Sequence, residues 1–139
     1  MASSVPRARR KAQADVVAAK TLKAAFFVNI TGYDELTATT YAALVSGGGT
    51  EVSNSGTGYT TGGIALASVA ASNLATNGAK VSAATLTLAS ATFTFRYIVI
   101  YDVTSGSIEA IVDAGSDKTV TGGTVTVTWD AVNGIIKWS

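Results

Sequence analysis

The sequence predicts an all-β protein, a β-sandwich or barrel-like domain with one short helix and an extended N-terminal arm. Several stretches of the 139-residue chain alternate apolar and polar residues, most clearly Thr92–Asp102. Turn signals that contain glycine, asparagine or serine separate these stretches. The one proline, Pro6, and six of the ten basic residues lie within the first 23 residues, ahead of most of this pattern.

The N-terminal segment is basic and the rest of the chain is acidic. Six basic residues precede residue 24 and only Asp15 opposes them, which gives a net charge of +5; residues 24–139 carry four basic and eight acidic residues, a net charge of −4. We expect residues 1–21 to form an extended arm. Ala12–Ala19 could add a turn or two of helix, but it is too short to be stable without a partner. Residues 22–139 are expected to form one β-rich body.

The body is predicted to begin with a strand and a short helix. Every second residue of Leu22–Ile30 is apolar, as in a half-buried strand. Asp34–Val45, most clearly from Thr37 on, is typical of a helix, because acidic residues at its start suit the positive end of the helix dipole. Three apolar residues would form the buried stripe of this helix: Tyr41, Leu44 and Val45. The glycines at 47–49 are expected to end it.

A loop and a hairpin are predicted next. Glu51–Gly63 is rich in glycine, serine and threonine, and we expect its one large residue, Tyr59, to pack onto the body. Ile64–Ala71 and Lys80–Leu88 are predicted strands. Asn77-Gly78 between them is a strong signal for a hairpin turn.

The strand Thr92–Asp102 is predicted to be the centre of the fold. Its aromatic and β-branched residues repeat with a period of two, so that one face should be buried as a unit. That face consists of five residues: Phe93, Phe95, Tyr97, Val99 and Tyr101. We expect Val127 and Trp129 to pack into the same core. Ile98 and Ile100 make the second face apolar too, which indicates that the distal half of the strand is covered on both sides.

The C-terminal third is predicted to add further strands. Ser105-Gly106 is a predicted turn into Ile108–Asp113, and the glycines near residues 115 and 122 are expected to interrupt the next strand segment. Valine and threonine alternate up to Trp129, and Asn133-Gly134 is a predicted turn into Ile135–Trp138.

Residue types for catalysis and cofactor binding are scarce. The sequence has no histidine and no cysteine, which removes the commonest general base, the commonest transition-metal ligand and any disulfide. The glycines of residues 56–63 lack the Gly-Lys-Ser/Thr ending of a phosphate-binding loop and the spacing of a dinucleotide site. Asp113, Asp117 and Asp130 lie at predicted strand ends, where turn capping is the common role. We expect no enzymatic activity, no cofactor and no metal.

Neither a membrane nor secretion is indicated by the sequence. No run of about 18 apolar residues is present, so no membrane partner is expected. The charged N-terminus is not followed by the apolar stretch of a secretory signal.

Partner binding is predicted for the arm and for one arginine of the central strand. The arm could bind nucleic acid through phosphates, dock into an acidic groove of a protein, or be a solvated tail. Its mixed basic and apolar character favours a protein partner over nucleic acid. The residues expected to meet carboxylates are Arg7, Arg9, Arg10 and Lys11, and those expected to fill a shallow apolar groove are Val16 and Val17. Arg96 is either a surface residue with a packed stem or, by a narrow margin, the partner of an acidic residue across a subunit contact.

Several motifs between Thr21 and Ser139 resemble those of a family of small structural proteins of tailed bacteriophages. They are TYAALV (Thr40–Val45), EVSNSGTGYTTGG (Glu51–Gly63), FTFRYIVIYD (Phe93–Asp102), IVDAGSDKTVTGGTVTVTWD (Ile111–Asp130) and NGIIKW (Asn133–Trp138). Asn54 is an insertion relative to this pattern, the connection around Ile64–Ala84 is unusually small and alanine-rich, and residues 1–20 lie outside it.

The resemblance implies a virion component without enzymatic activity. Two roles are compatible with it: a capsid decoration (cement) protein that binds and stabilises the major capsid lattice at the capsid surface, or a head-fibre, neck or tail module that binds a host receptor or glycan. The first is favoured, because Tyr59 is the only strong loop aromatic that a glycan site could use. Analogy with decoration proteins, together with apolar residues on both faces of the central strand, predicts a homo-oligomer, expected to be a trimer.

Overall fold

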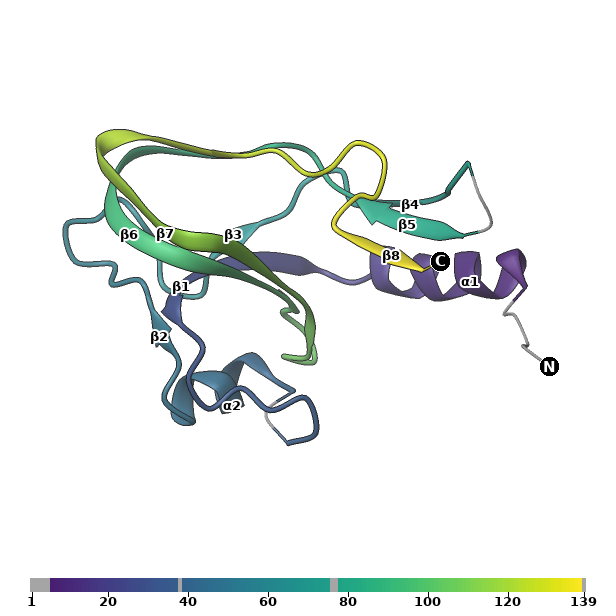
Figure 1. Cartoon of the computed structure of the whole chain (residues 1–139), viewed down its shortest axis with the longest axis horizontal. Helices are drawn as coiled ribbons and strands as arrows, with labels where there is room; N and C mark the ends of the chain where they lie inside the picture. Colours follow the sequence, from purple (N-terminus) through teal and green to yellow (C-terminus); the bar gives the residue numbers. More distant parts are fainter. Residues whose placement is uncertain (1–5, 38, 76–77, 139) are drawn as a thin grey trace. The chain divides into compact units, whose positions relative to one another are not determined.

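The computed structural model of the chain describes residues 6–37, 39–75 and 78–138. The chain forms two compact units, and each is assembled from segments that are distant in the sequence (Figure 1). Unit 1 comprises Met1–Lys20, Leu66–Leu86 and Thr128–Ser139, and unit 2 comprises Thr21–Ala65 and Thr87–Val127. The two longest strands have 17 and 20 residues, whereas the two described helices have 12 and 6. The predicted β-rich class is therefore confirmed.

Unit 2 is built on one sheet in the order β2-β1-β6-β7, with β3 also paired to β1. Its strands are β1 (Leu22–Asn29), β2 (Thr50–Glu51), β3 (Ile64–Ala65), β6 (Leu86–Asp102, whose first residue belongs to unit 1) and β7 (Ile108–Val127). β1 pairs antiparallel with β6 from Leu22 opposite Asp102 to Phe27 opposite Tyr97. β1 and β6 are thus the interior strands of the sheet, and β7 lies at its edge. The predicted first strand and central strand are both confirmed.

Consecutive phenylalanines of β1 pack into two different clusters. Phe26 contacts Phe95 at a ring-centroid distance of 4.8 Å and also contacts Phe93 and Tyr59. Phe27 packs instead with a second cluster, whose buried members are Ala25, Phe27, Leu44, Val99 and Tyr101. Successive side chains of a strand point to opposite faces, so both faces of this sheet are covered.

The single buried face predicted for the central strand is therefore divided. Phe93 and Phe95 belong with Phe26, whereas Val99, Tyr101 and the partly buried Tyr97 belong with Phe27. The prediction that Trp129 packs into this core is wrong, because Trp129 belongs to unit 1, where its Nε1 donates to the Ala84 carbonyl at 3.1 Å.

Helix α2 (Tyr41–Ser46) is shorter than the sequence suggested. Asp34 does not begin it: the Asp34 carboxylate accepts from the Leu36 N–H and the Thr37 hydroxyl, each at 2.8 Å, and so closes a turn of its own. Thr40 caps the helix by accepting from the Ala43 N–H at 3.1 Å. Leu44 is fully buried as predicted, but Val45 is 42% exposed, so it does not belong to the buried stripe.

Unit 1 contains a three-stranded sheet in the order β4-β5-β8, on which helix α1 packs (Figure 1). The elements are α1 (Arg7–Ala18), β4 (Ala70–Asn73), β5 (Ala79–Ser82) and β8 (Ile136–Trp138). The expected extended arm is therefore wrong for Arg7–Ala18, which form a helix of 12 residues. The physical reason is a partner within the chain, because α1 buries Ala14 and Val17 as it packs on β4 and β5.

The remaining predicted strands are shifted rather than absent. Ile64–Ala71 divides into β3 and β4, and Lys80–Leu88 divides into β5 and the start of β6. β4 and β5 are an antiparallel pair, as a hairpin requires, but Asn77 of the predicted turn lies outside the described residues. β7 continues through the glycines expected to interrupt it, and the turn before β8 forms as predicted, with the Gly134 N–H bonded to the Asp130 carbonyl at 2.8 Å.

Candidate functional site

The outward face of helix α1 is the best candidate for a binding surface in unit 1. One stripe of the helix, Arg10, Ala14 and Val17, is buried in helical spacing. A flanking stripe, about 100° around the helix from the buried one, carries the exposed residues Arg9, Gln13 and Val16. Val16 is 62% exposed, so its apolar side chain is available to a partner.

The structure separates the basic residues that were expected to act together. Arg10 is buried within unit 1, at 9% exposed, so it is not presented to a partner. The Arg7 guanidinium donates to the Leu74 carbonyl at 2.5 Å, and Lys11 forms an ion pair with Asp15 one helical turn later. Arg9 is exposed, and its side chain has no hydrogen bond or ion pair to any other residue that the structure describes.

The two valines expected to fill one groove of a partner lie on different sides of the helix. Val17 is 8% exposed and contributes to the core of unit 1, whereas Val16 points away from it. Of the predicted arm residues, Arg9 and Val16 are therefore the pair that the fold presents on one face, one charged and one apolar.

The two folded units carry net charges of opposite sign, as the N-terminal segment and the rest of the sequence do. Unit 1 contains seven basic and two acidic residues, a net charge of +5, and unit 2 contains three basic and seven acidic residues, a net charge of −4. Lys80 and Lys137 bring additional positive charge to unit 1 from β5 and β8. The basic character is thus a property of a folded unit and not of a tail.

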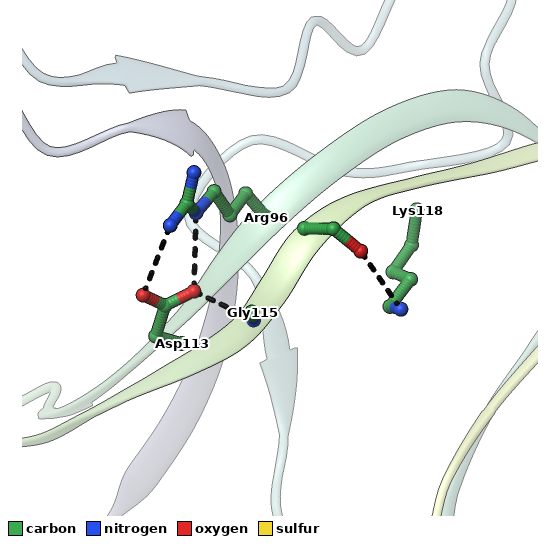
Figure 2. A network of polar contacts seen from close by, with 5 residues as sticks. Arg96, Asp113, Gly115 and Lys118 are labelled. Carbon is green, nitrogen blue, oxygen red and sulfur yellow. Dashed lines mark hydrogen bonds and ion pairs between the residues drawn. The ribbon is translucent and has the colours of Figure 1, made fainter.

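Arg96 has an acidic partner within the chain. Its Nε lies 3.1 Å from Oδ1 of Asp113, on the neighbouring strand β7, and the same carboxylate oxygen accepts from the Gly115 N–H at 2.8 Å (Figure 2). The hydrogen bond from Arg96 lowers the pKa of the Asp113 carboxyl below its usual value. Both side chains are substantially exposed, at 39% and 48%, so this pair orders a surface more than it stabilises the fold.

A cluster around Glu51 was not predicted from the sequence. The Glu51 carboxylate accepts from the Tyr59 hydroxyl at 2.6 Å, from the Gly62 N–H at 2.7 Å, and from the Tyr41 hydroxyl. The Tyr59 hydroxyl in turn accepts from the Phe26 N–H at 3.1 Å. We call Glu51, Tyr41, Tyr59 and Gly62 the Glu51 cluster. Its members come from β2, α2 and the loop between β2 and β3. The cluster ties this loop to β1.

The chemistry of the Glu51 cluster is structural. Burial, together with the hydrogen bonds to Glu51, raises the pKa of both Tyr41 and Tyr59, so that their hydroxyls remain protonated donors. Gly63 brings the same loop against β1: its φ is +87°, and a Cβ there would lie 2.3 Å from the Ala24 carbonyl oxygen. Tyr59 is 3% exposed, which confirms that it packs onto the body.

Other candidate groups also have structural explanations. Asp130 accepts from the N–H groups of Val132 and Asn133 at 2.8 and 2.7 Å, which is the turn-capping role expected for it. No set of three or more acidic side chains that could hold a metal occurs in the described ranges. No described helix has the length and apolar character needed to cross a membrane.

An exposed apolar loop in unit 2 was not singled out by the sequence either. Leu36 is 90% exposed and Tyr33 is 36% exposed, in the turn region before α2. Nothing in the alternation pattern distinguishes these residues, because Leu36 falls in the segment assigned to a helix and Tyr33 lies just before it.

No protein-family model, curated protein or solved structure matches this chain.

Proposed function

We propose that the protein is a non-enzymatic structural component of a tailed-bacteriophage virion, a capsid decoration (cement) protein that binds the major capsid protein. The observation that carries the proposal is the outward stripe of α1, in which Arg9 and Val16 are exposed on a helix that is fixed to a folded unit. A rigid surface of one cation and one apolar side chain suits an acidic protein partner with a shallow apolar depression. The phage setting comes from the sequence motifs.

Polar side chains of this protein bond to one another, which supports a structural role. The tyrosines and the carboxylate of the Glu51 cluster bond to one another, and Arg96 bonds to Asp113. Groups with these bonds stiffen the sheet but do not present an acid, a base or a nucleophile. A stiff β-rich body is what a protein that clamps a capsid lattice requires.

The receptor or glycan module is less well supported. Its strongest loop aromatic, Tyr59, is buried and bonded within the Glu51 cluster. The threefold assembly suggested by analogy stays a prediction, and the mass of the protein on the capsid and in solution tests it.

Attachment to undecorated capsids tests the proposal. Two substitutions introduce the same negative charge at exposed valines of unit 1: Val16→Asp on α1 and Val132→Asp in the turn before β8, at 62% and 71% exposed. Val16→Asp should weaken co-sedimentation with capsids by about tenfold, which corresponds to about 1.4 kcal/mol of lost contact. Val132→Asp should bind as the wild type does.

The reversal of charge at Arg9 adds a second measurement. Arg9→Glu should weaken binding most at low salt, because exposed ion pairs are screened as ionic strength rises. Equal binding by the wild type, Val16→Asp and Arg9→Glu would show that α1 is not the attachment surface. Failure of the wild type to bind any capsid, with binding to host cells or duplex DNA instead, would overturn the decoration role itself.

A further inference from the structure

The outer edge of β7 is a long open edge of the sheet in unit 2. β7 is the last strand in the order β2-β1-β6-β7 and runs for 20 residues, and no further strand pairs with it in the described part of the chain (Figure 1). Its N–H and C=O groups that point away from β6 therefore lack a strand partner there. Such an edge is a template for another strand, and proteins usually shorten it, charge it or cover it.

The second half of this edge lacks the charges and prolines that often protect an edge strand. Thr119–Val127 contains no charged residue and no proline, and charges occur just before it, at Asp117 and Lys118. Seven of its nine residues are threonine or valine, which favour strands, and the other two are Gly122 and Gly123. An edge that is long, uncharged and β-prone favours pairing with another chain.

The sequence of this segment reads the same in both directions. Thr119–Thr126 is TVTGGTVT, with its centre between Gly122 and Gly123. A palindrome suits an antiparallel contact between two identical strands, because a twofold axis then brings like residues together.

The backbone geometry at the centre of the palindrome also places equivalent residues of its two halves on the same face of the strand. Val125 is buried and Val120 partly buried, whereas Thr121 and Thr124 are exposed. Val120 and Val125 differ by an odd number of positions and would lie on opposite faces of a regular strand. Gly122, with a φ of +59° and open space where a Cβ would be, shifts the alternation by one residue, as glycine-led bulges do.

We propose that the free edge of β7 pairs with the same edge of a second copy of this chain, antiparallel about a twofold axis at Gly122-Gly123. Val120 then lies opposite the partner copy's residue 125, and Thr121 lies opposite its residue 124. In each pair the two residues share a face, so the valines continue the covered face of the sheet and the threonines the exposed one. The contact needs no capsid and gives a dimer, in contrast to the trimer expected by analogy.

Charges introduced at facing positions of the two β7 edges test the pairing and its register. Thr121→Glu/Thr124→Glu puts two carboxylates opposite each other in both symmetry-related pairs and should give a monomer. Thr121→Lys/Thr124→Glu puts opposite charges there and should restore the dimer. Thr87→Glu/Thr104→Glu adds the same two negative charges at exposed positions off β7 and should leave the dimer intact.

The measurement is mass by sedimentation equilibrium at tens of micromolar, with circular dichroism to show that each variant is folded. The wild type should have twice the chain mass of 14.0 kDa. A monomeric or trimeric wild type, or a dimer that survives Thr121→Glu/Thr124→Glu, would overturn the proposal. Failure of capsid binding would not, since these masses are measured on the free protein.

Cysteine cross-linking is a second test of register, because the chain has no native cysteine. Copies with Thr121→Cys mixed with copies with Thr124→Cys should form a mixed disulfide on oxidation, since opposite residues of a strand pair have Cβ atoms about 4.5–5.5 Å apart. Thr121→Cys alone should cross-link much less. Equal cross-linking of both samples would exclude this register.

Discussion

Removal of the Glu51 carboxylate should destabilise unit 2 more than any other exposed or half-buried charge change. In Glu51→Ala, the Tyr59 hydroxyl, the Gly62 N–H and the Tyr41 hydroxyl all lose their acceptor. A hydrogen bond to a charged group contributes about 1.5–3 kcal/mol. Water can replace part of this at a half-buried carboxylate, so we expect a loss of about 3–4 kcal/mol in the free energy of unfolding.

Glu51→Gln separates the charge from the shape of the side chain. The amide keeps one acceptor oxygen but loses the negative charge, so the loss should be smaller, about 1–2 kcal/mol. This variant also keeps the prediction testable if Glu51→Ala does not fold. Glu35→Ala is the matched control, because it removes the same charge at an exposed position.

Urea unfolding followed by the near-ultraviolet signal of the tyrosines measures these losses. Glu51→Ala should also lower the melting temperature by about 10 °C. Hydrogen exchange at the Gly62 amide gives a local readout, and its protection should fall first. If Glu51→Ala unfolds within about 0.5 kcal/mol of Glu35→Ala, the Glu51 cluster does not stabilise the loop.

Three further outcomes are expected. Phe95→Ala should cost about 3–5 kcal/mol, because Phe95 is 8% exposed and packs edge-on against Phe26; an unchanged urea midpoint would contradict this. Gly63→Ala should yield little folded protein, because the new Cβ would overlap the Ala24 carbonyl. Gly115 also has a positive φ but has open space around it, so Gly115→Ala should fold and lose about 1–2 kcal/mol in the free energy of unfolding. The protein should lose stability progressively as the pH rises above about 10. The unfolded chain releases its tyrosine protons there, whereas burial keeps Tyr41, Tyr59 and Tyr101 protonated in the folded state. A melting temperature that does not change between about pH 9 and 12 would refute this expectation.

Local periodicity was sufficient to predict the two interior strands of the sheet in unit 2. The alternation in Leu22–Ile30 and Thr92–Asp102 is set by the geometry of a single strand, so the sequence suffices to place β1 and β6. Turns with Gly106 and Gly134 are equally local, since they depend on a residue that accepts positive φ. The absence of histidine and cysteine also limits the chemistry whatever the fold.

Contacts between distant segments decided the other elements. A helix as short as Arg7–Ala18 is marginal alone, and it is fixed by β4 and β5, more than 50 residues away in the sequence. That packing buries Arg10 and Val17, which the sequence grouped with Arg9 and Val16.

The Glu51 cluster and the division of the aromatic face have the same origin. Glu51 gains its three donors only when α2 and the loop ending at Gly62 approach β2, and no spacing rule within one segment encodes that approach. Phe93 and Val99 share a parity in the sequence, yet they pack on opposite faces of the sheet, against Phe26 and Phe27 respectively, so the alternation of β6 shifts by one residue between Phe95 and Val99. The period of a strand predicts which side chains alternate, but the tertiary contacts with β1 decide where that alternation shifts.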